Sequence, residues 1–446
     1  MLYRIFKSLF YLAVKGYFRS IHLEDKKHVP EHGPLIFVAN HTSAFMDPIL
    51  LAVHIKRPVY FLARGEAFKS KLASVFFNWL HMIPIFRPEI SPDEVHKNEQ
   101  IFQRCFDHLS KGKTMMIFPE GFSKTERRLR PLKTGAARIG LGAEDQHDFN
   151  LGVTIMPIGI NYSNPHYFRS DVYVKFGDPI HLENYKEDYK ADPFSTAQEL
   201  TETIKVELER LTVIVSDKKL DQLVNDIERF YRSELRENLH GEHKAAQDFY
   251  LSREIVKAVT YYKSVKPRAT MMFQEKISNY LDALSRLHIS DAEIRQPKQY
   301  ARSIRHTLYF VLGLPIFLYG FIVNILPYQI VKFLSRKVRV RKDFIGSMKL
   351  AFGMFIFLIF YILLAVMFSF QTKWYWGLLF VITLYPSGLF CLNYIKHYYR
   401  RKGHMTYGRL YRKRKTTIQK LRARRKKILD ELESGRQLYL KQRILF

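Results

Sequence analysis

A histidine and an aspartate six residues apart are the first side chains whose types and spacing suggest chemistry. His41 and Asp47 follow an apolar run at residues 34–39. An imidazole titrates near neutral pH and a neighbouring carboxylate can hold its tautomer, so together the two groups could take a proton from a hydroxyl group. Asp47 is the only acidic residue between Glu31 and Glu66, and it is therefore the only local partner. By itself the pair is weak evidence, because such pairs more often stabilise a loop.

Two other segments carry side chains suited to a phosphorylated substrate. Arg87 ends the apolar run 83–87, and a guanidinium group can bind a phosphate through two hydrogen bonds. An acid, a glycine, a serine and several cations follow the apolar run 114–118: Glu120, Gly121, Ser123, Arg127, Arg128, Arg130 and Lys133. A helix that starts near Lys133 would direct amide hydrogens and cations at an anion. The alternative interpretation of this stretch is a solvated basic loop.

Short apolar runs alternate with segments of helical periodicity between about residues 23 and 215. The runs predict strands at 34–39, 59–63, 83–87, 114–118, 154–160 and 172–176. The periodic segments predict helices at 48–54, 66–80, 92–109, 133–143 and 196–211. This alternation predicts an α/β domain with a mixed, partly parallel sheet flanked by helices, in which ligand sites gather at the carboxyl ends of strands. Pro157 and Ile158, in the fifth strand, could line an acyl channel, although core packing explains them equally well.

The first twenty residues predict an amphipathic helix that lies in a membrane interface. Four cations fall within a narrow arc of the helical wheel: Arg4, Lys7, Lys15 and Arg19. A secretory signal is a competing interpretation, but the uncharged run 8–14 is short and Lys15 interrupts it. An ordinary soluble helix is the other alternative. Residues 216–300 are charged and helix-prone, which is typical of a helical linker or packing module.

Charge and apolar length indicate a membrane protein. The chain has 446 residues, with 71 Lys and Arg against 42 Asp and Glu, and its formal net charge is +29. Such a charge favours contact with nucleic acid or with anionic lipid headgroups. Segments 307–331, 350–370 and 374–395 contain no Asp, Glu, Lys or Arg, and each has the about 20 residues that a helix needs to cross the hydrocarbon core. Cys105 and Cys391 lie far apart, which excludes a small disulfide-stabilised secreted scaffold.

The charges around these segments predict their orientation. The connection 332–349 carries seven Lys and Arg and the tail 396–446 carries 18, whereas residues 371–373 carry one. The last two segments are therefore predicted to form a hairpin with both ends in the cytoplasm. The segment 307–331 contains two prolines and two glycines, which favours a re-entrant or bent hairpin over a kinked span with the main domain outside. The predicted organisation is a helix at 1–22, an α/β domain at 23–215, a charged helical region at 216–300, a membrane region at 301–400 and a basic helical tail at 401–446.

Taken together and in this order, the motifs resemble those of the glycerophospholipid acyltransferase family. The resemblance covers about residues 30–185 and is strongest for the branch that contains the fungal glycerol-3-phosphate/dihydroxyacetone-phosphate acyltransferases. The segments that resemble this branch are Phe45–Pro48, Pro131–Ala136, Gly159–Tyr162, Phe168–Ser170 and Phe176–Ile180. Ordered motifs are a specific signal, whereas each motif alone is not.

The resemblance implies that His41 is a general base and that Asp47 orients it. The spacing departs from the common family pattern, which has four residues between the two, because five residues separate them here. On a continuous helix one extra residue would rotate Asp47 by about 100°. His41 precedes the predicted helix, so the turn between the two residues can absorb the extra one. A catalytically inactive lipid-binding relative is the alternative.

At the other motif positions, the resemblance and the cations imply binding roles. The acceptor and its phosphate would contact Arg87, Glu120, Gly121, Ser123, Arg130 and Lys133. The acyl donor, acyl-CoA or acyl carrier protein, would lie against Pro157 and Ile158. No metal and no bound cofactor are expected.

The predicted function is membrane-bound transfer of an acyl group from a thioester to glycerol 3-phosphate, with dihydroxyacetone phosphate as a further acceptor, in phospholipid synthesis. Lysophosphatidate is the second choice of acceptor. A function of another class is a membrane-anchored protein that binds nucleic acid or a partner through its basic tail, where tyrosines lie among the cations. The position of the tail directly after a predicted span favours anionic lipid over nucleic acid. The predicted location is a bacterial inner membrane or an organelle membrane, with the catalytic domain on the cytoplasmic face.

Overall fold

The structure is a computed structural model that describes residues 2–68, 70–86, 92–215, 217–236, 243–295 and 304–444. The chain forms two compact units, and each is described by itself. The first contains residues 1–214, 243–249 and 334–354, and the second contains residues 215–242, 250–333 and 355–446. The first unit therefore combines the predicted α/β domain with a short stretch of the predicted membrane region.

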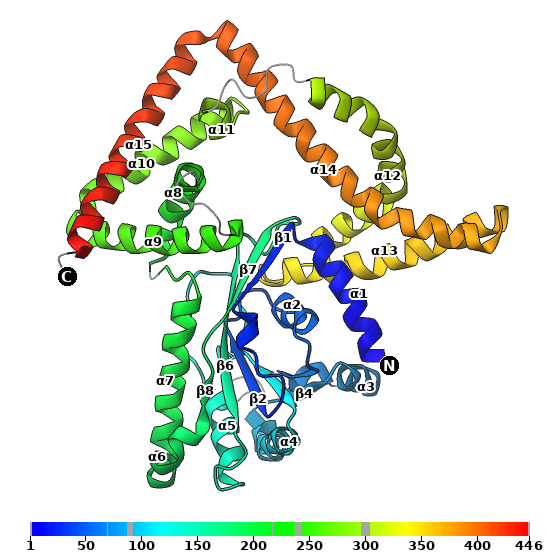
Figure 1. The fold of residues 1–446 in the computed structure, drawn as a ribbon, viewed down its shortest axis with the longest axis vertical. Coiled ribbons are helices and arrows are strands. Elements are labelled where there is room, and N and C mark those ends of the chain that lie inside the picture. The colour runs from blue at the N-terminus through cyan, green and yellow to red at the C-terminus, as the bar shows by residue number, and fades with distance from the viewer. Residues whose placement is uncertain are drawn as a thin grey trace. The chain divides into compact units, whose positions relative to one another are not determined.

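An eight-stranded sheet forms the centre of the first unit (Figure 1). Its strands are β1 (Ser20–Glu24), β2 (Leu35–Ala39), β3 (Val59–Arg64), β4 (Met82–Ile85), β5 (Thr114–Ile117), β6 (Thr154–Tyr162), β7 (Asp171–Phe176) and β8 (Ile180–His181). They are ordered β1-β7-β6-β2-β5-β3-β4, and β8 pairs with β6. The central strand β2 is parallel to both β5 and β6, whereas β6 is antiparallel to β7 and β8. The prediction of a mixed, partly parallel sheet is confirmed.

Helices cover both faces of this sheet. Side chains of α1 (Leu2–Tyr17) and α2 (Met46–His54) pack on one face. Those of α4 (Asn98–Ser110), α5 (Gly135–Asp145) and α7 (Pro193–Leu211) pack on the other. The shorter helices of the unit are η1 (Lys26–His28), η2 (Gly65–Phe68), α3 (Lys71–Trp79), η3 (Pro92–Lys97), η4 (Leu182–Tyr185) and α6 (Lys186–Ala191). Because both faces are covered, β2 and β5 are buried along their whole length, and this explains their continuous apolar runs.

Element boundaries at the N-terminal helix and at α5 differ from the sequence prediction. β1 begins at Ser20 and pairs in parallel with β7, so the N-terminal helix ends at Tyr17 and not at residue 22. β1 was not predicted as a strand. Its five residues are all partly exposed, and its sequence has no apolar run like those that predicted the other strands. α5 begins at Gly135, two residues after the predicted start at Lys133.

The second unit is helical, although the start of α9, the end of α12 and the start of α13 belong to the first unit. Its helices are α8 (Lys218–Arg236), α9 (Lys244–Val265), α10 (Pro267–Arg286), α11 (Asp291–Arg295), α12 (Ile304–Lys337), α13 (Phe344–Gln371), α14 (Trp374–Lys413) and α15 (Lys415–Ile444). α12, α13 and α14 are long and apolar enough to cross a membrane. α14 continues without a break to Lys413, so the predicted boundary at residue 401 lies inside a helix.

Small and polar residues join the three apolar helices within the second unit. An added Cβ at Gly320 of α12 would lie 2.6 Å from the carbonyl oxygen of Ser387 of α14, so only glycine permits this close approach. The Asn324 side chain of α12 accepts a hydrogen bond from the Tyr361 hydroxyl of α13 at 2.5 Å and donates one to Ser387 Oγ at 3.4 Å. The ribbon of α12 bends along its course (Figure 1), and Pro327 lies inside this helix.

Candidate active site

The ring of His41 and the carboxylate of Asp47 meet directly after β2. His41 Nδ1 lies 2.8 Å from Asp47 Oδ2. The Asp47 side chain is fully buried, whereas that of His41 is 17% exposed. The His41 ring stacks on Phe118 with the ring centroids 4.3 Å apart, and its second nitrogen, Nε2, has no hydrogen-bond partner among the described residues. One ring nitrogen is therefore fixed by the carboxylate and the other remains available to a substrate.

The turn between the two residues absorbs the extra residue of the spacing. α2 begins at Met46, so His41 precedes the helix and Asp47 lies in its first turn. Ala44 has a φ of 40°, in the left-handed region, where the chain changes direction before the helix starts. The amide of Ser43 donates a hydrogen bond to Asp47 Oδ2 at 2.7 Å. The rotation considered for a continuous helix therefore does not separate the two side chains.

Tyr162 and Asn40 also belong to this site, although the sequence motifs alone gave no role for either residue. The Tyr162 hydroxyl, at the end of β6, donates a hydrogen bond to Asp47 Oδ1 at 2.8 Å. Asn40 exchanges two hydrogen bonds with the backbone of Ile160 in β6, at 3.0 and 2.7 Å, and so links β6 to the residue before His41. The sequence did contain a signal for each residue. Tyr162 ends one of the segments that resemble the family, and Asn40 directly precedes His41.

Two hydrogen-bond donors besides His41 hold the Asp47 carboxylate. Burial and the neighbouring carboxylate raise the pKa of Tyr162, so its hydroxyl keeps its proton and donates. The amide of Ser43 can only donate. An ionised carboxylate can only accept hydrogen bonds, so beside an ionised Asp47 a neutral His41 ring carries its proton on Nδ1. This tautomer leaves a lone pair on His41 Nε2, which can accept a proton from a hydroxyl group.

Glu120 joins the loop after β5 to the loop after β2. Its Oε1 accepts a hydrogen bond from the amide of His41 at 2.7 Å, and its Oε2 accepts one from the amide of Arg130 at 3.4 Å. Glu120 is 4% exposed, and burial raises its pKa to about 7 in spite of these two hydrogen bonds. The amide of Lys124 returns a hydrogen bond to the His41 carbonyl at 3.1 Å. The two loops are therefore tied together on both sides of the histidine.

The structure places the predicted phosphate-binding cations in different surroundings. The Lys133 side chain crosses Gly121, because a Cβ added at Gly121 would lie 3.2 Å from Lys133 Cε. Arg130 is paired with a carboxylate, since its Nε and Nη2 lie 3.1 and 2.8 Å from Glu126 Oε1. Arg87 lies outside the described residues. The assignment of these cations to a phosphate group stays a prediction.

The part of the chain that contains these contacts matches a known family. The acyltransferase family model matches residues 20–161, which run from β1 to β6 and include His41, Asp47 and Glu120. Residues 20–161 form an acyltransferase-family domain.

Relatives of this acyltransferase-family domain come from yeast and from bacteria. Glycerol-3-phosphate O-acyltransferase 1 of Saccharomyces cerevisiae is 24% identical over 77% of this chain and 56% of its own length. Glycerol-3-phosphate O-acyltransferase 2 of the same yeast is 33% identical over 30% of this chain and 18% of its own length. The 1-acyl-sn-glycerol-3-phosphate acyltransferase of Bacillus subtilis is 26% identical over 29% of this chain and 58% of its own length. The chain thus spans about half the length of the first yeast relative.

Within the acyltransferase-family domain, Pro157 and Ile158 lie in the middle of β6. Ile158 is level with Ala39 of β2, two residues before His41, and its side chain is buried in the core beneath α1 and α2. The carbonyl of Pro157 accepts a hydrogen bond from the amide of Gly177 at 2.8 Å. Both residues are therefore part of the packed strand, one strand from the histidine, and their contact with an acyl donor stays a prediction.

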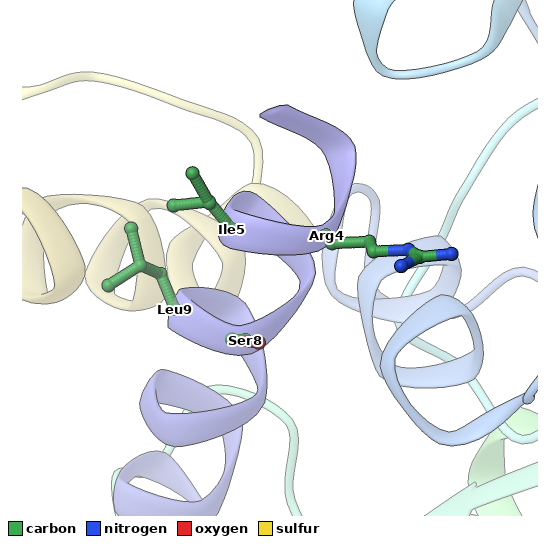
Figure 2. A pocket seen from close by; sticks show the side chains of 4 residues that line it. All are labelled: Arg4, Ile5, Ser8 and Leu9. Atoms are coloured by element: carbon green, nitrogen blue, oxygen red, sulfur yellow. The ribbon is translucent and has the colours of Figure 1, made fainter. Parts of the chain in front are cut away.

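A surface hollow lies on α1 of the first unit. Figure 2 shows its four lining residues, with Ile5 and Leu9 on one side of the helix and Arg4 on the other. Ile5 is 48% exposed, so α1 presents both apolar and cationic side chains to its surroundings. The location of this amphipathic helix in a membrane interface stays a prediction. No group of three or more His, Cys, Asp or Glu side chains in the described part of the chain is arranged to hold a metal ion.

Proposed function

We propose that this chain is a membrane-bound O-acyltransferase that moves a fatty acyl group from a thioester to a hydroxyl group of a phosphorylated glycerol-type acceptor. The observation that supports this most directly is the contact of 2.8 Å between His41 Nδ1 and the buried carboxylate of Asp47, with Nε2 facing away from that bond. The acyltransferase-family match over residues 20–161 supports the same reaction class.

In the proposed reaction, His41 acts as a general base. His41 Nε2 takes the proton of the acceptor hydroxyl while that oxygen attacks the thioester carbonyl carbon. The tetrahedral intermediate collapses with cleavage of the carbon–sulfur bond, and the leaving thiolate takes the proton back from the imidazolium. The products are an ester and a free thiol, and no acyl-enzyme is formed. Asp47 stabilises the transient positive charge on the ring, and general base catalysis of this kind contributes about 10²–10⁴-fold to the rate.

Glycerol 3-phosphate is the proposed acceptor, with dihydroxyacetone phosphate as a further one, and lysophosphatidate is the alternative. The names of the two yeast relatives support glycerol 3-phosphate, and the name of the bacterial relative supports the alternative. Lys133 beside Gly121 suits a phosphate in either case. The proposed donor is acyl-CoA or acyl carrier protein.

Substitution of His41 tests the reaction. His41→Ala is expected to remove measurable acyl transfer by the purified full-length protein, because no other described side chain occupies the position of the base. His147→Ala is the control, since the side chain of this exposed histidine bonds only the backbone carbonyl of Ala143 in α5. Acyl transfer that survives in His41→Ala at the rate of the control would refute the assignment.

The acceptor is tested by competition. One labelled acyl thioester is offered with glycerol 3-phosphate, dihydroxyacetone phosphate and lysophosphatidate in parallel, and the expected order of kcat/KM places glycerol 3-phosphate first. A higher value for lysophosphatidate would favour the alternative. Arg87→Ala is expected to raise KM for the preferred acceptor, and an unchanged KM would exclude Arg87 from phosphate binding.

Chain connectivity supports a membrane arrangement in which α13 and α14 cross but α12 does not. Between residues 215 and 303, the described part of the chain contains no helix that is long and apolar enough to cross. The chain then passes along α12 and rejoins the first unit at Leu334. α12 would therefore begin and end on the same face of the membrane, and Pro327 allows it to bend back.

Contacts inside the second unit agree with this arrangement. Asn324 of α12 bonds Tyr361, which lies near the middle of α13. In the proposed arrangement, the first part of α12 would reach about half the depth of the span, and the residues after Asn324 would return. α13 and α14 would then cross as a hairpin, with the basic connection and the basic tail both on the cytoplasmic face, as the distribution of Lys and Arg predicts.

A further inference from the structure

The first turns of α13 belong to the same unit as the acyltransferase-family domain. Leu350 is 2% exposed and packs into the core beneath α1 and α2. A Cβ added at Gly346 would lie 2.2 Å from the carbonyl oxygen of Pro165, so the helix backbone touches the loop between β6 and β7. The segment from Arg341 to Leu350, which we call the docking segment, is therefore a packed part of the catalytic unit.

The hydroxyl of Ser347 in the docking segment lies inside the turn that joins His41 to Asp47. Ser347 is 1% exposed. Its Oγ donates a hydrogen bond to the Ser43 carbonyl at 2.8 Å and accepts one from the amide of Met46 at 3.0 Å. These two backbone groups flank Ala44, the residue with positive φ, in the turn that accommodates the extra residue. Ser347 thus bridges the two ends of the turn that brings His41 to Asp47.

Asp343 of the docking segment bonds the loop after β5. The Ser123 hydroxyl donates a hydrogen bond to Asp343 Oδ2. Arg341 Nη2 lies 2.7 Å from the same carboxylate oxygen and 3.0 Å from the Ser123 carbonyl oxygen. Asp343 is 4% exposed, and a buried carboxylate that is ionically paired and hydrogen-bonded fixes the groups around it. The loop that carries Glu120 is thereby attached to the same segment as the turn after His41.

We propose that Ser347 and Asp343 are positioning residues of the acyltransferase site. Ser347 sets the geometry of the His41–Asp47 turn, and Asp343 sets that of the acceptor-side loop at Glu120–Ser123, so the start of a membrane helix forms part of the active site. This inference rests on the proposed function. Neither residue touches the reacting atoms, and each acts through the backbone or side chain that it bonds.

The two residues predict different kinetic signatures. Ser347→Ala is expected to lower kcat about tenfold with KM for donor and acceptor nearly unchanged, because misplacement of the base affects the chemical step. Asp343→Ala is expected to raise KM for the acceptor about tenfold with a smaller change in kcat, because its loop faces the acceptor. Ser347→Thr keeps the hydroxyl and should restore most of kcat. The matched control is Ser387→Ala, a buried serine of α14 that bonds the Leu384 carbonyl at 2.8 Å.

The thermal midpoint of each variant separates positioning from stability. The inference is supported if kcat falls in Ser347→Ala at an unchanged midpoint and returns in Ser347→Thr. It is overturned if Ser347→Ala has the kcat of the unsubstituted protein, or if its loss of kcat only follows a loss of folded protein that Ser387→Ala shares.

A second measurement needs no substrate, and so distinguishes failure of this inference from failure of the proposed function. Diethyl pyrocarbonate modifies the neutral imidazole nitrogen, and mass spectrometry gives the rate at His41 with His147 as internal reference. Ser347→Ala is expected to change the His41 rate at least about threefold relative to His147, since the ring orientation depends on the turn. An inactive chain that shows this change refutes only the acyltransferase proposal, whereas an unchanged ratio refutes the positioning role.

Discussion

Asp47 combines complete burial with hydrogen bonds to both carboxylate oxygens. Its partners come from the turn before α2 and from β6, and their contacts lie between 2.7 and 2.8 Å. A buried charge is tolerated only when such bonds replace water. The same bonds hold the carboxylate against His41 Nδ1, so the orientation of the ring depends on contacts from β6 and from the turn before α2.

The first prediction at this scale concerns Tyr162. Tyr162→Phe removes one of the donors to Asp47 and leaves Ser43 and His41, so kcat is expected to fall about three- to tenfold, the effect of one buried hydrogen bond, with little change in KM. Tyr17→Phe is the control, because this buried hydroxyl bonds the Pro165 carbonyl at 3.0 Å and not the carboxylate. The measurement is the steady-state kcat and KM of both variants. Equal kcat values for Tyr162→Phe and Tyr17→Phe would show that Tyr162 does not act through Asp47.

The second prediction concerns the pH dependence of stability. Burial raises the pKa of Glu120 to about 7, so between about pH 4.5 and 7 the folded chain binds a proton that the unfolded chain has released. Stability should therefore fall as pH rises through this window, by up to about 3 kcal/mol in total. Glu120→Gln keeps an acceptor for the His41 amide and should flatten the dependence. The measurement is the thermal midpoint of the unsubstituted protein and of Glu120→Gln from pH 5 to 8. Glu202→Gln, at an exposed glutamate, is the control. If the midpoints of the unsubstituted protein and of Glu120→Gln change with pH in the same way, the expectation is wrong.

Among the elements, β6 connects most parts of the catalytic unit. It pairs with β2, β7 and β8, bonds Asn40 through Ile160, and carries Tyr162. Its position between β2 and β7 depends on a close approach of α7, since a Cβ added at Gly159 would lie 2.1 Å from the Leu211 carbonyl oxygen. A backbone oxygen cannot move aside in the way that a side-chain end can, so this contact requires glycine.

Gly159→Ala is therefore expected to destabilise the first unit by about 1–3 kcal/mol through overpacking. Gly135→Ala is the matched control, because a Cβ added at this position of α5 meets no described atom within 4 Å. The thermal midpoint in detergent is the measurement. A variant at residue 159 that is as stable as the control would show that α7 can move away from the strand.

Sequence patterns located most elements of the acyltransferase-family domain because apolar runs and helical periodicity are local properties. β2, β3, β5 and β7 lie within one or two residues of their predicted bounds. β1 was not predicted because its residues are partly exposed and have no apolar run. The turn between His41 and Asp47 depends on the positive φ of Ala44 and on a hydroxyl from α13, and neither can be read from spacing.

At the scale of the whole molecule, the proposed membrane arrangement predicts the side on which three sites are exposed. Single cysteines at His32, Thr372 and Gln437 are introduced after Cys105 and Cys391 are replaced by alanine. In sealed vesicles, an impermeant maleimide is expected to label positions 32 and 437 from one side and position 372 from the other. Labelling of 32 and 437 from opposite sides would show that α12 crosses the membrane.

The basic tail predicts a preference for anionic lipid. Arg425 is 11% exposed and paired with Asp291 and Glu234 within the second unit, so part of the tail charge is structural. The exposed cluster at residues 412–415 is the better candidate for headgroups. Replacement of these four cations by glutamine is expected to reduce, by about half or more, the thermal stabilisation of the detergent-solubilised protein by phosphatidylglycerol relative to phosphatidylcholine.

The control for this experiment replaces four lysines of the first unit by glutamine: Lys56, Lys111, Lys186 and Lys190. The effect of the tail variant should diminish as salt is raised, because exposed charges are screened. If the tail variant keeps its response to phosphatidylglycerol but loses binding of RNA or DNA in a mobility-shift assay, the nucleic-acid interpretation replaces the lipid one.

The sequence by itself determined the α/β class, the order of the motifs and the three apolar segments, because each depends on residue types within a short window. The tertiary structure decided how the site is assembled. Tyr162 meets Asp47 across 115 residues, and Ser347 meets Ser43 across 304 residues. Hydrogen bonds between such distant residues leave no periodicity in the chain, since they form only when a strand and a long apolar helix pack against the same turn.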